Sequence, residues 1–378
     1  MSEQPAGREI RTASPGRIEF IGNHTDYNGG EVLGVSLNLA VRARVRSRRD
    51  RRLVFSSEGI QGAYRGDLDH MEKQEGPLAW ANYPLGILSE LQAAGYGPDH
   101  GMEISFSSDL PTGAGLSSSA AIELATLEGV CRLQGIELDR RCKVLLAQRA
   151  ENNFVGVPCG MLDQAVSCFG EPDHLVRIDC AITDFQTVPL PHGLHFWVFN
   201  TNLKHSLVDS MYACRHSECR EALRIIRESR PGIEHLAQAP VEALGLLEAG
   251  SDIRRRAEHV IRENLRVREC VAALEKGDLA MVGDLLFASH ASSRDLFENS
   301  IPELDTLVEI LSTFRDRGVI GARLTGGGFG GAVMALTTEH FDQSAAASVL
   351  KACRSGHKGA AAPGFIHVTT GPGTRSLD

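Results

Sequence analysis

A run of small residues placed directly before an apolar segment is the feature that most constrains this chain. Pro111-Thr112-Gly113-Ala114-Gly115 leads into Leu116-Ser117-Ser118-Ser119-Ala120-Ala121, and the apolar pattern continues to Leu127. The pattern predicts a loop followed by a helix over 120–127. A helix N-terminus with accessible N–H groups attracts anions. A Gly/Ser linker is the alternative, but linkers do not run straight into such a segment. We therefore predict a phosphate-binding loop.

The composition indicates a globular protein that acts on small molecules. Its 378 residues are enough for about two domains, and 42% hydrophobic with 23% charged residues are ordinary values for such a protein. The formal net charge of -9 argues against nucleic acid or an anionic membrane as the main partner. We expect small-molecule ligands, with no nucleic acid and no membrane as partner.

The cysteines indicate a reducing environment. There are nine of them, an odd number, and they include no C-x-x-C pair, so reduced thiols are favoured over a disulfide framework or a zinc site. Residues 1–11 are polar, and no later apolar run approaches the length of a membrane span. We expect a cytoplasmic protein that works as a monomer.

Strand-like and helix-like segments alternate in the first half of the chain, and helices dominate the second half. We predict strands over 17–21, 32–45, 102–107 and 195–200, and helices over 80–94, 210–227 and within 253–317. The pattern changes between residues 179 and 194, where Pro189 and Pro191 appear. We place the domain boundary there, with domains at 1–185 and 186–378.

Arginines alternate with apolar residues over 40–46, which places Arg42, Arg44 and Arg46 on one face of a strand. A basic binding stripe would show this pattern, and so would a solvated sheet face. The acidic composition of the whole chain favours the solvated face.

A second glycine cluster, Thr325-Gly326-Gly327-Gly328-Phe329-Gly330-Gly331, contains the spacing G-x-G-x-x-G. A dinucleotide site requires a helix after the glycines, but residues 332–336 are strand-like. The cluster therefore predicts a strand-loop-strand turn. Five glycines in six residues exceed what a turn needs, which favours a loop that closely approaches a ligand over a simple turn.

Candidates for acid-base chemistry and hydroxyl binding lie in two other segments. Residues 14–30 place Arg, Asn, His, Asp and Tyr on one strand and the loop after it, a natural surface for a polyol, although a polar turn has the same composition. Residues 151–164 offer Glu151 and Asp163 on either side of a Gly/Pro break. One could hold a metal and the other accept a proton. Taken alone, Asp163 is more often a charge at a helix N-terminus.

Together, residues 16–30, 111–121, 159–164 and 326–331 resemble the galactokinase branch of the GHMP small-molecule kinases, and the resemblance covers nearly the whole chain. It implies an α+β fold of two α/β lobes, N-terminal and C-terminal, with the active site in the cleft between them. It also implies transfer of the γ-phosphate of ATP to the anomeric hydroxyl of galactose, giving galactose 1-phosphate and ADP.

The resemblance also implies which residues carry the chemistry. Asp163 matches the catalytic base, and Arg17 matches the cation beside both that carboxylate and the transferred phosphate. Such a cation keeps the carboxylate ionised and offsets charge in the transition state. Glu151 and a serine of the loop, with Ser118 as the best match, correspond to the ligands of Mg²⁺, which prefers few protein oxygens plus phosphate.

The substrate contacts come from the same resemblance, with ATP and a hexose as substrates and Mg²⁺ as the metal. The nucleotide-binding positions are Trp80 and Tyr83 for adenine, and Gly113, Ala114, Gly115, Leu116, Ser117, Ser118 and Ser119 for the phosphates. The sugar-binding positions are Asn23, His24, Asp26, Gly160, Asp163 and Tyr212. A lone tryptophan usually belongs to a core. Base binding at Trp80 is favoured only because the segment 80–83 also resembles the family.

Asn23 departs from the family pattern. Galactokinases usually carry a glutamate there, which contacts the sugar hydroxyl at carbon six. Asparagine is neutral and does not repel a carboxylate, so galacturonate is the alternative substrate. A non-catalytic sensor of sugar and nucleotide is a further alternative. The presence of Arg17, Glu151 and Asp163, together with the complete serine loop, disfavours it.

Overall fold

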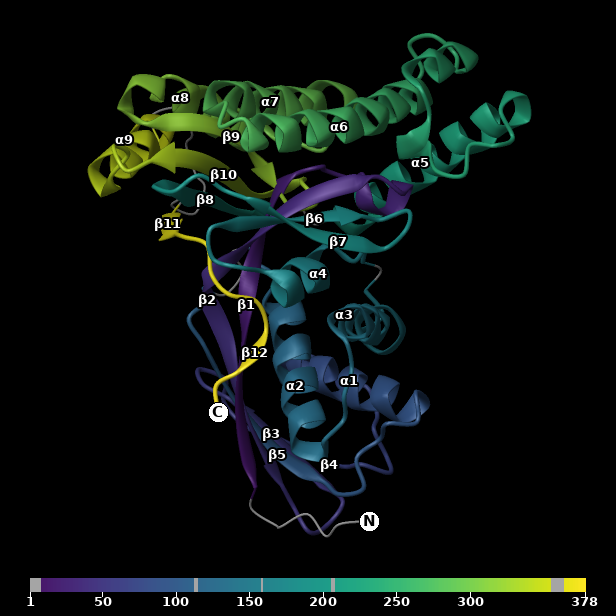
Figure 1. Ribbon diagram of the computed structural model, residues 1–378, viewed down its shortest axis with the longest axis vertical. Helices are drawn as coiled ribbons and strands as arrows, with labels where there is room; N and C mark the ends of the chain where they lie inside the picture. The colour runs from purple at the N-terminus through teal and green to yellow at the C-terminus, as the bar shows by residue number, and fades with distance from the viewer. Residues whose placement is uncertain (1–7, 112–114, 158, 205–207, 355–363) are drawn as a thin grey trace.

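Two β-sheets organise the chain (Figure 1). One apolar cluster contains residues of both. The computed structural model describes residues 8–111, 115–157, 159–204, 208–354 and 364–378.

The larger sheet is built around two long antiparallel strands. Its strands are β1 (Glu9–Ile21), β2 (Glu31–Ser47), β3 (Arg52–Ser57), β4 (Tyr64–Asp67), β5 (Met102–Ser108), β6 (His174–Asp179), β7 (Asp184–Pro189) and β12 (Arg375–Ser376). The order is β12-β1-β2-β5-β3-β4, and β6 pairs with both β2 and β7. The β3–β5 pair is parallel and the other pairs are antiparallel.

Buried and exposed side chains alternate at the end of β2, as the sequence predicts. Val41 and Val45 are buried, whereas Arg42, Arg44 and Arg46 are exposed. The arginines thus lie on a solvated face of the larger sheet, because side chains point to opposite faces along a strand.

The smaller sheet lies in the upper part of Figure 1. Its strands are β8 (Leu194–Lys204), β9 (Val319–Thr325), β10 (Gly330–Thr338) and β11 (Gly364–Val368). The order is β11-β8-β10-β9, with every pair antiparallel. Because β9 and β10 pair across the second glycine cluster, the predicted strand-loop-strand turn is confirmed.

Helices cover both sheets. The α-helices are α1 (Asn82–Ala93), α2 (Ser118–Gln134), α3 (Arg140–Arg149), α4 (Leu162–Phe169), α5 (Val208–Ser229), α6 (Asp252–Glu275), α7 (Leu279–Ser292), α8 (Pro302–Ser312) and α9 (Gln343–Arg354). Short helical segments are η1 (Asp26–Asn28), η2 (Gly76–Ala81), η3 (Ala150–Val155), η4 (Leu236–Gln238), η5 (Val241–Leu246), η6 (Ser293–Phe297) and η7 (Arg315–Arg317). Helices α6, α7 and α8 lie over the smaller sheet in Figure 1. In the described part of the chain, no helix has the length and apolarity needed to cross a membrane.

Helix α2 confirms the helix predicted after the Gly/Ser run, and it packs against β1 and β2. It begins at Ser118 and ends at Gln134, and the residue that follows, Gly135, has a φ of 69°. A Cβ at Gly129 would lie 2.5 Å from Cγ2 of Val45, so the glycine lets the helix approach the strand closely. This packing fixes where the N-terminus of α2 lies.

One apolar cluster packs against both sheets, and a second lies on the other face of the smaller sheet. The first cluster includes Leu33 of β2, Val198 of β8 and Met334 of β10. The chain changes sheets between the end of β7 at Pro189 and the start of β8 at Leu194. Strand β12 then returns to pair with β1, so the larger sheet contains residues from both sides of the predicted boundary at 185. That boundary stays a prediction.

Candidate active site

A guanidinium and a carboxylate form the centre of the candidate site. Arg17 on β1 donates from Nε to Oδ1 of Asp163 on α4 at 2.6 Å, and its Nη2 lies 2.5 Å from the same oxygen. The Ser117 hydroxyl donates to Oδ2 of Asp163 at 2.5 Å. The Arg17 side chain is 9% exposed and that of Asp163 is 26% exposed. The carboxylate therefore keeps an open side that a ligand can reach.

The same arginine holds the predicted phosphate loop. Nη1 of Arg17 donates to the carbonyl of Gly115 at 3.0 Å, and its backbone N–H donates to the carbonyl of Leu116 at 3.1 Å. These bonds tie the loop to β1, beside the start of α2. Gly113 and Ala114 of this loop lie outside the described residues.

The three serines of the loop have different surroundings. Ser117 has a φ of 54°, uncommon for a residue with a side chain, and its hydroxyl contacts Asp163. Ser118 is exposed at the first position of α2, and its hydroxyl has no hydrogen bond to the described residues. The Ser119 hydroxyl contacts the carboxylate of Glu151. The loop therefore offers Ser118 to a ligand most openly.

A buried acidic cluster lies beside the loop. Glu151 is 5% exposed and Glu123 is fully buried, and Nε2 of Gln164 donates to both carboxylates, at 2.6 and 3.2 Å. Burial and the charge of Asp163 raise the pKa of Glu151, while burial and the charge of Glu151 raise the pKa of Glu123. Oε1 of Glu123 is buried without a partner. A cation here would relieve an excess of negative charge.

The loop after β1 holds His24 in one neutral form. Its Nε2 lies 3.1 Å from the carbonyl oxygen of Gly327, and its Nδ1 lies 3.0 Å from the hydroxyl of Tyr27. Because a carbonyl can only accept, Nε2 carries the proton and the tyrosine donates to Nδ1. Burial, together with the nearby His259, lowers the pKa of His24 to about 3.

Asp26, Gly160 and Tyr212 lie around the same loop. A Cβ at Gly160 would be 1.9 Å from Oδ2 of Asp26, so only glycine allows this approach. The ring of Tyr212 lies 5.4 Å from that of His24. Burial raises the pKa of Asp26 to about 6, and the charges of neighbouring carboxylates, including Asp163, add to the shift. The structure thus brings the predicted sugar positions together.

Asn23 is bound on all sides by the protein. It is 1% exposed, and its Nδ2 donates to Oε1 of Glu19 at 2.9 Å and to the carbonyl of Gly326 at 2.8 Å. Its Oδ1 accepts from Nδ2 of Asn299 at 2.8 Å. Both amide hydrogens and the amide oxygen are therefore used within the molecule.

The second glycine cluster closely approaches the loop of residues 22–30, called the sugar loop below. Gly326 and Gly328 each have a φ of 81°, and a Cβ at Gly328 would lie 2.2 Å from a neighbouring backbone oxygen. The carbonyls of Gly326 and Gly327 accept from the side chains of Asn23 and His24. The close backbone approach favoured by the sequence is thus made to another loop, and contact with a ligand stays a prediction.

The two predicted adenine-binding aromatics lie at the edge of the core. Trp80 on η2 packs edge-on against Phe106, with ring centroids 6.0 Å apart, and its Nε1 is buried without a partner. Tyr83 lies on α1 near the acidic cluster, since burial and the charge of Glu151 raise its pKa. Their contact with a nucleotide stays a prediction.

Sequence reasoning missed Glu19 and Arg323. Glu19 is 5% exposed and Arg323 is fully buried, and Nη2 of the arginine lies 2.9 Å from Oε1 of the glutamate. Burial raises the pKa of Glu19, and the charge of Arg323 opposes that shift. The available signal for Glu19 was a charged residue within the apolar run 18–21. Its partner on β9 is distant in sequence and left no such signal.

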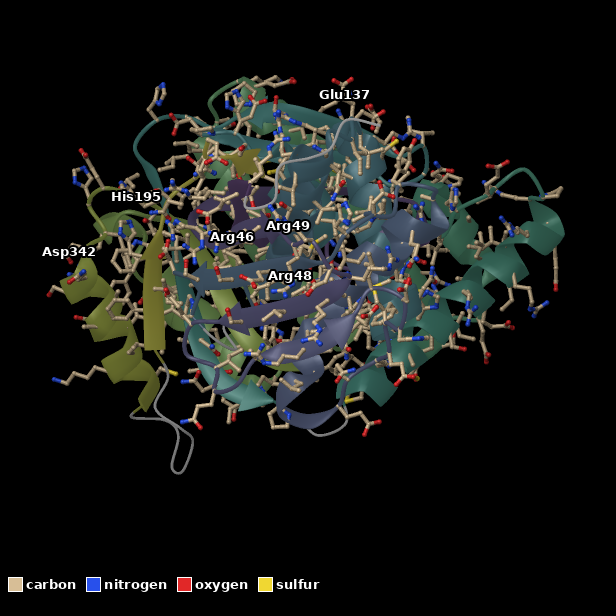
Figure 2. All side chains as sticks on the ribbon, turned by 90° about the horizontal axis from the view of Figure 1, so that it is seen from below. Arg46, Arg48, Arg49, Glu137, His195 and Asp342 are labelled. Atoms are coloured by element: carbon tan, nitrogen blue, oxygen red, sulfur yellow. The ribbon has the colours of Figure 1, made fainter. Side chains whose placement is uncertain are left out.

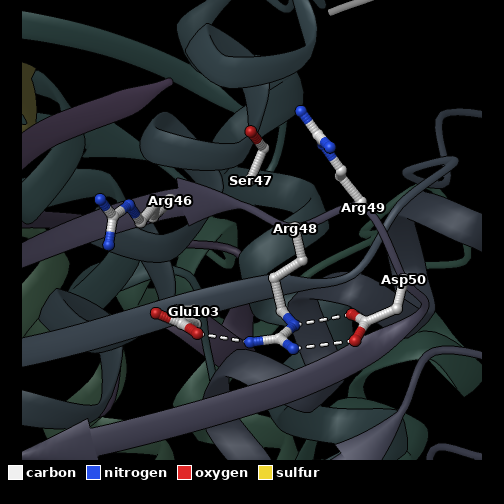
Figure 3. A pocket seen from close by; sticks show the side chains of 6 residues that line it. All are labelled: Arg46, Ser47, Arg48, Arg49, Asp50 and Glu103. Carbon is white, nitrogen blue, oxygen red and sulfur yellow. Dashed lines mark hydrogen bonds and ion pairs between the residues drawn. The ribbon is translucent and has the colours of Figure 1, made fainter. Parts of the chain in front are cut away.

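A basic depression lies at the end of β2 away from the sugar loop (Figure 2, Figure 3). It is lined by Arg46, Ser47, Arg48, Arg49, Asp50 and Glu103. Nε and Nη2 of Arg48 donate to the Asp50 carboxylate at 2.7 and 2.8 Å, and Nη1 contacts Glu103. These ion pairs satisfy Arg48, and the depression takes no part in the candidate site.

Among the described residues, no three or more His, Cys, Asp or Glu side chains are placed to hold a metal ion together. A cation at Glu151 would therefore depend on a hydroxyl and on phosphate oxygens, as is common for Mg²⁺.

Family models match three segments of the chain. The model of the GHMP kinases N terminal domain matches residues 82–171, that of the GHMP kinases C terminal matches 270–356, and the galactokinase galactose-binding signature matches 3–47. These segments contain the phosphate loop, the second glycine cluster and the sugar loop. The fold and the site therefore define a small-molecule kinase of the GHMP class.

Individual relatives narrow this class. Galactokinase from Thermotoga maritima is 38% identical over 329 residues, which cover 87% of this chain and 89% of the relative. Galactokinase from Roseiflexus sp. is 38% identical over 325 residues, covering 85% and 82%. The crystal structure of Lactococcus lactis galactokinase complexed with galactose matches with a TM-score of 0.90 at 34% identity, over 98% of this chain and 95% of that one. This chain belongs to the galactokinase family.

More distant structures share the fold alone. A mevalonate kinase matches with a TM-score of 0.66 at 17% identity, over 96% of this chain and 99% of that one. The two-lobed architecture is thus common to kinases of different small molecules, and the substrate must be argued from the site.

Proposed function

We propose that this protein catalyses the ATP-dependent phosphorylation of the anomeric hydroxyl of galactose, giving galactose 1-phosphate and ADP. The observation that carries the proposal is the 2.6 Å contact between Arg17 and Asp163 beside the phosphate loop, in a chain of the galactokinase family. Phosphoryl transfer depends mainly on positioning and on charge stabilisation, and this pair offers both.

Asp163 is the proposed base. One oxygen is held by Arg17 and the other by Ser117, which orients the carboxylate while its partial exposure leaves room for a sugar hydroxyl. As the sugar oxygen attacks the γ-phosphorus, its proton passes to Asp163 and the bond to ADP breaks. Arg17, which contacts both this carboxylate and the loop, keeps the base ionised and offsets charge on the transferred group.

Mg²⁺ is the proposed metal cofactor, with Glu151 and Ser118 as its protein ligands. The fit rests on the excess of buried negative charge at Glu151 and Glu123 and on the Ser118 hydroxyl, which has no partner among the described residues. When bound, the metal would neutralise the charge of phosphate oxygens during transfer.

ATP is the proposed donor, with adenine beside Trp80 and Tyr83. The start of α2 supports this placement, because free N–H groups at a helix N-terminus bind phosphate. The proposed phosphate contacts are Gly113, Ala114, Gly115, Leu116, Ser117, Ser118 and Ser119.

Galactose is proposed to lie beside Asp163, along Asp26, Gly160 and Tyr212. The carboxylate of Asp26 offers hydroxyl acceptors, and Tyr212 offers a ring face. The polar atoms of Asn23 and His24 are used by the protein, so these residues would shape the sugar site through their positions.

Neither galacturonate as the substrate nor a non-catalytic sensor is favoured. The relatives are galactokinases, and the matched crystal structure contains galactose. The argument for galacturonate required a pocket without a carboxylate at Asn23, but Glu19 lies 2.9 Å from the amide of Asn23. A uronate would meet that negative charge. A non-catalytic sensor has no support in the relatives compared above, which are named as galactokinases.

We also propose that the protein works as a cytoplasmic monomer. The support for a reducing compartment is that all nine cysteines are free of disulfides. Sedimentation equilibrium of the purified protein tests the monomer, and a mass that is a multiple of the chain mass would contradict it.

The test of the proposed function is a substrate panel. Purified protein is incubated with ATP, Mg²⁺ and galactose, galacturonate, N-acetylgalactosamine, glucose or arabinose, and sugar 1-phosphate is measured. We expect the highest kcat/KM with galactose, and no product after chelation of the metal. The absence of galactose 1-phosphate, or a higher kcat/KM with galacturonate, would contradict the proposal.

A further inference from the structure

A buried carboxylate lies on β1, just before the loop that carries Asn23. Glu19 lies on β1, four residues before Asn23, and is 5% exposed. Its Oε1 accepts from Nδ2 of Asn23 and from Nη2 of Arg323, both at 2.9 Å. Arg323 is fully buried, and Glu19 is its carboxylate partner in the part of the chain that the structure describes. A buried guanidinium requires such a counter-charge.

Asn23 has no amide hydrogen left for a ligand. One hydrogen goes to Glu19 and the other to the carbonyl of Gly326, while the amide oxygen accepts from Asn299. At 1% exposure, Asn23 is in contact with protein on every side. Its side chain therefore positions Glu19 and does not take the place of the family's glutamate as a sugar contact.

The second oxygen of Glu19 has no partner among the described residues. Oε2 makes no hydrogen bond to them, and the Glu19 side chain keeps 7% exposure, so this oxygen is the one left for a ligand. Besides burial, the charge of Glu19 raises the pKa of Asp26 and of Tyr212. The charge of Glu19 therefore acts on two residues of the proposed sugar site.

We propose that Glu19, positioned by Asn23, accepts a hydrogen bond from the hydroxyl of galactose at carbon six. This inference rests on the proposed function. The family pattern has the carboxylate at position 23, and a hydrogen bond joins positions 19 and 23 here. A carboxylate and an amide can therefore exchange places across that bond while the site keeps one of each. Glu19 then determines specificity, because a carboxylate binds a hydroxyl and repels another carboxylate.

The test compares galactose with 6-deoxygalactose, which lacks the hydroxyl in question, in the wild-type protein and in Glu19→Gln. Glutamine keeps the shape and the bond to Asn23 but removes the charge of the acceptor. We expect kcat/KM for galactose to fall about 10- to 100-fold and kcat/KM for 6-deoxygalactose to change less than about threefold, because hydrogen bonds to charged groups are the strong ones. Equal losses on both sugars would mean a purely structural role and would overturn the proposal.

Glu31→Gln is the matched control. Glu31 lies on β2, is 3% exposed and pairs with Arg177 and Arg268, so it is a buried, ion-paired glutamate like Glu19. We expect this variant to change kcat/KM for both sugars by the same factor. A loss confined to galactose in Glu31→Gln would show that such selectivity does not report a contact with the hydroxyl, and would overturn the proposal.

The reciprocal exchange Glu19→Asn with Asn23→Glu decides the matter if Glu19→Gln does not fold. We expect the double variant to fold, as measured by its melting temperature, and to prefer galactose over 6-deoxygalactose as the wild type does. Failure to fold, or a folded enzyme without this preference, would overturn the proposal. In the wild type, no turnover of galactose would overturn the proposed function itself, whereas turnover without preference over 6-deoxygalactose would overturn only the role of Glu19.

Discussion

The phosphate side and the sugar side of the candidate site are built differently. On the phosphate side two of the proposed groups keep access to solvent, whereas Glu151 is buried: the Asp163 side chain is 26% exposed, and Ser118 is exposed at the start of α2. On the sugar side they are enclosed: Asn23 is 1% and Glu19 is 5% exposed. The phosphate side keeps partly exposed oxygens at Asp163 and Ser118, and the polar atoms of Asn23 on the sugar side are enclosed by neighbouring residues.

This difference matches what each side has to do. Under the proposed function, the phosphate side receives a metal and a group whose charge changes during the reaction, so acceptors there must stay available. The sugar side must present one fixed shape, and side chains that hydrogen-bond one another are held in place before the sugar arrives. Substitutions should therefore impair chemistry on the phosphate side and stability on the sugar side.

Asp163→Asn should have the largest effect, a loss of catalysis on the phosphate side. The substitution removes the proposed base but hardly changes the volume, so kcat should fall about 10²- to 10⁴-fold. Steady-state kinetics with galactose measures the loss. Melting temperature and ATP binding should stay near their wild-type values. An enzyme with wild-type kcat would rule out Asp163 as the base.

Asn23→Glu should show that the sugar side tolerates little change. It places a second carboxylate where the amide now donates to Glu19 at 2.9 Å. Repulsion at that distance is worth several kcal/mol at an effective dielectric of about 20. Urea denaturation should therefore show a large loss in the free energy of unfolding.

Asn153→Glu is the matched control for this variant. Asn153 also donates its amide to a glutamate, Glu90, at 3.0 Å, but it does so on the surface. The cost there should stay below about 1 kcal/mol, because solvent screens exposed charges. Equal costs for the two variants would remove the contrast between buried and exposed sites.

Asp26→Asn should change how the stability of the sugar side depends on pH. The pKa of Asp26 in the folded protein is raised to about 6, mainly by burial, so folding favours its protonated form. The stability that this group contributes is present below about pH 4 and is lost as the pH rises through 6. Asparagine cannot lose a proton, so the variant should gain stability relative to wild type between pH 4 and 7, by at most about 3 kcal/mol.

Urea denaturation at several pH values measures the difference in unfolding free energy between the two proteins. A difference that is the same at pH 4 and pH 7 would mean that Asp26 ionises as it does in the unfolded chain.

Trp80→Ala should have the smallest effect and tests the outer edge of the phosphate side. If the indole stacks on adenine, its loss should weaken ATP binding by about 1–3 kcal/mol, and ATP should change its fluorescence in the intact protein. Trp197→Phe is the control, because Trp197 is 2% exposed in the core of the smaller sheet. Unchanged ATP affinity in Trp80→Ala would mean that Trp80 only packs in the core and does not bind adenine.

Local sequence was enough to predict features that depend on neighbouring residues alone. The Gly/Ser run and the apolar run after it predicted that α2 begins near the phosphate loop, and α2 begins at Ser118. The alternation in β2 predicted which face is solvated. These features follow from backbone freedom and from the periodicity of side chains, which neighbouring residues determine.

Partners that are distant along the chain were beyond such reasoning. The pattern at Asn23 suggested an uncharged pocket, but the fold places Glu19 against it and Arg323 against Glu19. The three serines of the loop are alike in sequence, yet they face Asp163, solvent and the acidic cluster respectively.

The sequence by itself determined the class of fold, the position of the loop before α2 and the enzyme family, because short motifs and periodic patterns carry them. Only the tertiary structure decided where the charges of the sugar site lie. Whether a buried carboxylate keeps its charge depends on the groups packed around it. For Glu19 one of those groups, Arg323, comes from a strand that is 304 residues away along the chain.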